Sequence, residues 1–130
     1  MLEAASPDKS IEGGYIQTAR QLFQSGPIIQ ATFSAEQEKI AMELCRRGVS
    51  LEDLENAIIV GCTRKYISAI NSGTPGRIAS LSYFLPVIEE IREGTLTPTY
   101  SENARRRLPD LEKQWLDLKS TAKGESQWKS

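Results

Sequence analysis

The chain has 130 residues, a length that suits one domain. It carries 16 Lys and Arg residues against 17 Asp and Glu residues, so the net charge of -1 gives no overall argument for nucleic-acid binding, and only local basic clusters can supply one. The absence of histidine excludes Ser-His-Asp and Cys-His catalytic sets and histidine-based zinc sites.

The first predicted helix runs from Tyr15 to Ser25, where apolar residues recur at helical spacing. Gly26-Pro27 is expected to end it. The preceding residues, 1–14, have no such periodicity and predict a flexible N-terminal segment. We therefore expect a helical core domain over residues 15–94.

Two further helices are predicted from their capping residues. Ser34 and Gln37 match a capping box, and the helix they begin should end at Gly48, which suits a left-handed cap. Ser50 is expected to begin the next helix. The apolar residues of that helix lie on more than one of its faces, so we expect it at the centre of the core.

A loop and two helices complete the expected fold. The clearest loop covers residues 71–76, and a fourth helix should follow near Ser80, with Pro86 tolerated only in the first turn or as a kink. Residues 95–120 predict a linker and a C-terminal amphipathic helix, and residues 121–130 a flexible tail. The sequence thus predicts an all-α protein, with a single compact domain of about five helices and flexible N- and C-terminal tails. Within the last helix, a disturbance is expected at Pro109.

The cysteines and the apolar runs bear on compartment and cofactors. Cys45 and Cys62 have no C-x-x-C partner, so we expect reduced core residues rather than a metal site or a disulfide scaffold. The longest apolar run, 57–62, is too short for a membrane span, and no signal peptide is visible. We expect a cytoplasmic protein without membrane contact, without a cofactor and without enzymatic activity.

The segment 53–73 has a distinctive spacing. Ala57, Gly61 and Ile67 stand where a helix-turn-helix places a small residue, a turn glycine and a buried β-branched residue, so the segment resembles phage-repressor-type DNA-binding domains. This resemblance implies that a second helix enters the major groove of duplex DNA, with a dimer reading two half-sites. The residues at the start of that helix are Thr63, Arg64, Lys65 and Ser68. The alternative is one uninterrupted core helix in which Gly61 is a point of tight packing.

A second resemblance covers about residues 19–93. It rests on the order of the segments ARQLF at 19–23, SAEQEKI at 34–40, GVSLE at 48–52 and IASLSYF at 78–84. This order resembles the C-terminal helical domain of DnaD-like bacterial primosome and replication-initiation proteins. That family ends with a Y-x-x-x-I-x-x-x-W helix that helps to hold single-stranded DNA.

In this chain the family's terminal helix corresponds to Tyr83, Val87 and Ile91, so isoleucine replaces the tryptophan. The resemblance implies weak, sequence-tolerant binding of single-stranded DNA. Core packing is the alternative role of Tyr83.

Two basic clusters are candidate phosphate contacts. One comprises Arg64, Lys65 and Arg77, and the other is the triplet Arg105, Arg106 and Arg107. Such cations support salt-dependent binding, and a neighbouring tyrosine would offer a stacking surface to a single strand. The alternative for the triplet is pairing with a protein partner or with nearby acidic residues. These acidic residues are Glu89, Glu90 and Glu93.

Two functions follow from these observations. The first is a non-enzymatic DNA-binding or replication-accessory module of a bacterium or mobile element, with DNA and a protein of a replication or regulatory complex as partners. The alternative is a protein–protein interaction adaptor that binds no nucleic acid and uses Trp115 and Trp128 as anchors. Gly61 separates the two DNA-binding forms, because a turn there favours duplex binding and a continuous helix favours single-strand binding.

Overall fold

The computed structural model describes residues 2–129, and the side chains of residues 13–121. Within these ranges the chain forms one compact body of α-helices and one short 3-10 helix, η1, which confirms the all-α prediction. The elements are α1 (Leu2–Phe23), α2 (Ala35–Arg46), α3 (Leu51–Ser72), η1 (Leu81–Phe84), α4 (Leu85–Arg92) and α5 (Pro98–Lys129). None of the helices described is long and apolar enough to cross a membrane.

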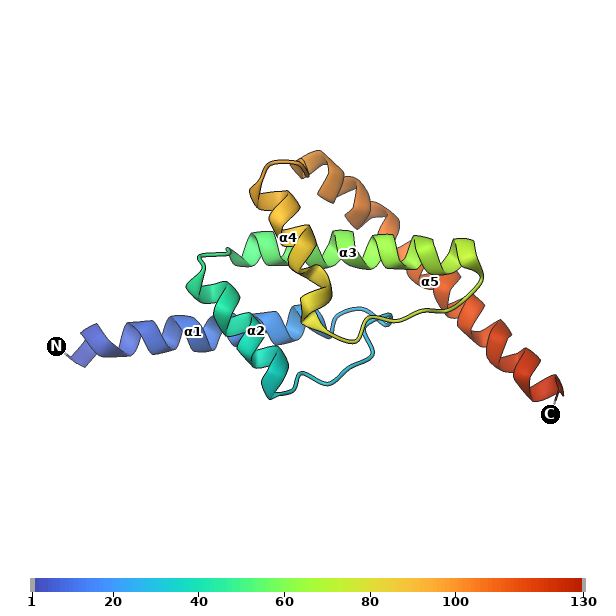
Figure 1. The fold of residues 1–130 in the computed structure, drawn as a ribbon, viewed down its shortest axis with the longest axis horizontal. Coiled ribbons are helices and arrows are strands. Elements are labelled where there is room, and N and C mark those ends of the chain that lie inside the picture. Colours follow the sequence, from blue (N-terminus) through green and yellow to red (C-terminus); the bar gives the residue numbers. More distant parts are fainter. Residues whose placement is uncertain (1, 130) are drawn as a thin grey trace.

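Helix α3 lies at the centre of the molecule, as the apolar character of its sequence predicted (Figure 1). It packs against α1, η1, α4 and α5. The beginning of α1 and the end of α5 extend toward opposite ends of the molecule (Figure 1). The largest fully buried side chains come from several elements, so the core joins segments that are far apart in the sequence. They include Phe23, Tyr66, Phe84 and Trp115.

Most of the predicted helix ends are observed. The Ser50 hydroxyl accepts a hydrogen bond of 3.0 Å from the backbone N–H of Asp53, and Gly48 has a positive φ of 80°. Ser34 precedes α2, but its side chain makes no capping bond. Gln37, its expected partner in the capping box, is buried, and its Oε1 accepts a 2.8 Å hydrogen bond from the backbone N–H of Leu81. The capping-box prediction is therefore wrong, because a tertiary contact uses the glutamine.

Gly61 lies inside a continuous helix. Residues 53–72 all belong to α3, so the chain does not turn where the helix-turn-helix interpretation requires it. A Cβ atom at Gly61 would lie 2.5 Å from Cδ1 of Phe84. The glycine therefore lets an aromatic ring pack directly on the helix backbone, which confirms the alternative of an uninterrupted core helix with tight packing at this point.

The two terminal helices are longer than predicted. Helix α1 begins at Leu2 rather than Tyr15, and α5 runs through Pro109 to Lys129 without the expected disturbance. Pro109 and Arg105, one turn before it, are both exposed, so water can satisfy the carbonyl that the proline leaves without a donor. Pro86 lies in the first turn of α4, as expected.

The loop before η1 is held by long-range hydrogen bonds. Ile78 forms an isolated parallel bridge with Ile29, with its N–H donating to the carbonyl of Ile28 at 2.8 Å. The indole N–H of Trp115 donates to the carbonyl of Gly76 at 3.0 Å. These bonds hold the loop between α3 and η1 against the segment between α1 and α2 and against α5.

Candidate nucleic-acid interface

Two neighbouring cations of α3 lie over exposed tyrosine rings. The guanidinium carbon of Arg64 is 5.7 Å from the ring centre of Tyr100, and Nζ of Lys65 is 5.8 Å from that of Tyr83. Both distances are within the range of cation–π attraction. Tyr83 is 40% exposed and Tyr100 is 44% exposed, and both count among the few large apolar side chains exposed in the described part of the chain. We call Arg64, Lys65, Tyr83 and Tyr100 the aromatic–basic face.

Arg64 is held by a bidentate ion pair. Its Nη1 and Nη2 donate to the two carboxylate oxygens of Glu90 at 2.9 and 3.0 Å. These bonds raise the pKa of Arg64 and lower the pKa of Glu90, so both groups stay charged. Because the carboxylate neutralises the guanidinium, Arg64 contributes a fixed planar surface more than a free positive charge.

The acidic residues of α4 take partners other than the arginine triplet. Glu90 pairs with Arg64, and the neighbouring Glu89 pairs with Arg47 at the end of α2. Arg105 pairs instead with Glu55 of α3, at 3.4 Å. The alternative in which the arginine triplet pairs with the acidic residues of α4 is thus wrong for Glu89 and Glu90.

Lys65 and Arg77 lie on the η1 side of the face, and among the described residues neither has a carboxylate partner. A Cβ atom at Gly76 would lie 3.2 Å from Cε of Lys65, so the lysine side chain passes beside the loop that carries Arg77. Arg77 itself is exposed. The fold therefore brings together the two unneutralised members of the first basic cluster.

The arginine triplet is divided by the geometry of α5. Successive residues of an α-helix point about 100° apart. Arg105 reaches Glu55, Arg106 lines a shallow hollow with Glu102, and Arg107 lines a pocket that it shares with residues of the aromatic–basic face. Only Arg107 therefore joins the candidate interface.

The other four predicted residues differ in their accessibility to a ligand or partner. Thr63 is buried, with 5% of its surface exposed, so it does not present a surface contact. Ser68 is exposed one turn beyond Arg64. Trp115 is only 1% exposed and packs edge-on against Tyr66, so it belongs to the core and is not an anchor for a partner. The side chain of Trp128 lies outside the range that the structure describes.

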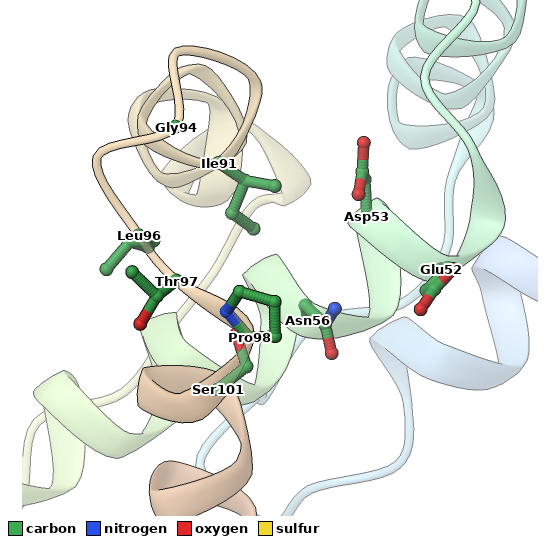
Figure 2. Close-up of a pocket in the computed structure, with 9 residues that line it drawn as sticks. All are labelled: Glu52, Asp53, Asn56, Ile91, Gly94, Leu96, Thr97, Pro98 and Ser101. Carbon is green, nitrogen blue, oxygen red and sulfur yellow. The ribbon is translucent and has the colours of Figure 1, made fainter.

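A second pocket lies near the beginning of α3. It has a volume of about 390 Å³ and is bounded by α3, the end of α4 and the beginning of α5 (Figure 2). Figure 2 shows Asn56 beside Pro98 and Ser101, whereas the carboxylate of Asp53 points away from them. Glu52 also lines this pocket, so its polarity is opposite to that of the aromatic–basic face. Among the described residues, no group of three or more potential ligands lies close enough to hold a metal ion.

Sequence reasoning missed Tyr100. This residue follows a segment expected to be a linker, and no motif distinguishes it. Its importance comes from α5 beginning at Pro98 and packing beside α3, which places the ring under Arg64.

Comparisons with protein-family models, with curated proteins and with solved structures found no match for this chain.

Proposed function

We propose that this chain binds single-stranded DNA through the aromatic–basic face. The observation that carries the proposal is the pairing of two exposed tyrosine rings with adjacent cations of one helix. Stacking on aromatic rings and contact of cations with phosphates are the two components of sequence-tolerant single-strand binding. The continuity of α3 through Gly61 supports the single-strand form of the hypothesis over the duplex form.

In the proposed complex, bases of the strand stack on Tyr83 and Tyr100. Lys65, Arg77 and Arg107 contact phosphates, because they are the cations on or beside the face that pair with no described carboxylate. The DnaD-like resemblance agrees with this class of ligand. A replication-accessory role in a bacterium or mobile element is the setting that the resemblance implies.

The number of cations makes the proposal quantitative. Each phosphate neutralised on a single strand contributes about -0.7 to the slope of log K against log salt concentration, so contacts from Lys65, Arg77 and Arg107 give a slope of about -2. The slope should be measured by fluorescence anisotropy with a labelled oligothymidylate and a labelled duplex of equal length. We expect salt-dependent binding with preference for the single strand.

A variant of the aromatic–basic face and a control variant elsewhere on the surface test the location of the site. The double variant Lys65→Gln and Arg77→Gln should weaken binding and reduce the magnitude of the salt slope by about 1.4. Lys113→Gln is the control, because Lys113 is an exposed residue of α5 that lies about 200° around the helix from the buried Trp115. Folded protein that binds neither DNA form at low salt would overturn the proposal and favour the adaptor alternative. Preference for the duplex would overturn the single-strand assignment.

A further inference from the structure

A pocket of about 240 Å³ lies between α3 and α5, at the edge of the aromatic–basic face. It combines an aromatic ring, an aliphatic side chain, an amide, a hydroxyl and guanidinium groups. The lining residues used below are Thr63, Arg64, Ile67, Tyr100, Asn103 and Arg107. This combination differs from the rest of the face, where the partly exposed ring of Tyr83 lies beside Lys65.

Thr63 supplies an independent reason to expect a ligand. Its Oγ1 atom is buried and has no hydrogen-bond partner among the described residues. Nearly all buried polar atoms of folded proteins have a partner, and an unpartnered one is unfavourable by about 1 to 3 kcal/mol. Thr63 is also one of the residues that line the pocket, so a polar ligand bound there would lie beside the residue whose hydroxyl lacks a partner.

The remaining lining residues define the chemistry of that group. The side chain of Ile67 and the ring of Tyr100 offer apolar surface to a flat molecule, and Asn103 carries both a hydrogen-bond acceptor and two donors. Arg107 is exposed and pairs with no described carboxylate. The pocket is smaller than the roughly 300 to 1,000 Å³ of sites for drug-sized ligands, which suits one heterocyclic base better than a larger ligand.

We propose that this pocket receives a single base of the bound DNA strand, with the base stacked on Tyr100 and the amide of Asn103 contacting its edge. This inference rests on the proposed function. It adds that one nucleotide is held differently from its neighbours, with Arg107 on its phosphate. The complex should therefore have a measurable preference among bases, in contrast to simple backbone binding.

The test uses two variants that alter the pocket without changing its charge. Asn103→Leu removes the amide and places apolar atoms in the pocket, and Thr63→Val removes the unpartnered hydroxyl at nearly constant shape. Gln17→Leu on α1 is the matched control, because it makes an equivalent amide-to-leucine change at an exposed position. Binding of the 12-mers of dT, dC and dA, and of an abasic 12-mer, should be measured by anisotropy at several salt concentrations.

We expect Asn103→Leu to lower the affinity for the preferred homopolymer by about 5- to 100-fold, because it leaves polar atoms on the edge of the bound base without a partner. Its salt slope and its affinity for the abasic strand should remain those of the wild type. Thr63→Val should weaken binding while leaving the midpoint of urea unfolding unchanged or raised.

The outcomes separate this inference from the proposed function. Salt-dependent binding by wild type and both pocket variants, with equal affinities and equal base preferences, would overturn the pocket while leaving the aromatic–basic face in place. A destabilised Thr63→Val protein would overturn the argument from the unpartnered hydroxyl. Absence of salt-dependent binding in the wild type would overturn both proposals.

Discussion

The substitution Gly61→Ala tests the close packing at the centre of the fold. Alanine is more favourable than glycine in a helix interior by about 1 kcal/mol, so helix propensity alone predicts a more stable protein. The added Cβ, however, would lie 2.5 and 2.6 Å from Cδ1 and Cε1 of Phe84. The Phe84 side chain is 0% exposed, so its ring cannot move aside into solvent.

The two effects oppose each other, and the steric effect should be larger. Overpacking a core by a methyl group is unfavourable by about 1 to 3 kcal/mol, and contacts this short place the substitution in the upper part of that range. After the gain in helix propensity is subtracted, we expect Gly61→Ala to lose about 1 to 2 kcal/mol of unfolding free energy. Urea unfolding followed by circular dichroism would measure this loss.

A double-mutant cycle assigns the loss to the correct contact. In a Phe84→Leu background the ring is absent, so Gly61→Ala should lower the unfolding free energy less than it does in the wild type. The difference between the two losses should exceed about 0.5 kcal/mol, the usual deviation from additivity for independent sites. A single variant that is more stable than the wild type, or additive effects in the cycle, would refute the reasoning.

Three further predictions concern buried or paired polar groups. Gln37→Leu removes the acceptor of the buried Leu81 N–H, and we expect urea unfolding to show a loss of about 1 to 3 kcal/mol; a loss below about 0.5 kcal/mol would contradict the contact. Burial raises the pKa of the Cys62 thiol to about 12, so Cys62 should react more slowly with iodoacetamide at about pH 8 than the half-buried Cys45. Peptide mapping by mass spectrometry would measure the two alkylation rates, and equal rates would refute the burial of Cys62. The hydrogen bonds from Arg64 lower the pKa of Glu90 in the folded protein. The ionised Glu90 therefore stabilises the fold fully at a pH above its unfolded-state pKa. This stabilisation is lost as the pH falls through the lower folded-state pKa. The difference in unfolding free energy between wild type and Glu90→Gln should thus shrink as the pH falls below the ordinary glutamate pKa of about 4.3, and a constant difference would contradict the ion pair.

Local signals in the sequence predicted the helix boundaries that depend on neighbouring residues. The N-cap at Ser50, the left-handed glycine at Gly48 and the early position of Pro86 in its helix are all observed. Each involves atoms within one turn of the chain, so a short stretch of sequence contains the necessary information. The same reasoning failed for the capping box at Ser34, because Gln37 bonds to a residue more than forty positions away.

The composition of the candidate site depends on contacts between distant segments. The rotation between neighbours on a helix predicts that Arg105, Arg106 and Arg107 diverge, but only the packing of α5 on α3 decides which of them meets the face. The burial of Trp115 has the same origin, because its indole N–H bonds to the loop carbonyl of Gly76. A pattern of residues along one helix cannot specify either contact.

The distribution of charge limits how the proposed site would work. Arg64 is neutralised by Glu90, so in the proposed complex the phosphates are contacted by Lys65, Arg77 and Arg107, which pair with no carboxylate of the described residues. A protein with a net charge of -1 has no overall attraction for a polyanion, so long-range steering should contribute little to association. The affinity must then come from short-range contacts, chiefly stacking on the two exposed tyrosines and occupation of the neighbouring pocket. Bases of a duplex are already stacked and paired, whereas those of a single strand are free to make these contacts. The weak net electrostatics therefore favour the same ligand as the exposed rings.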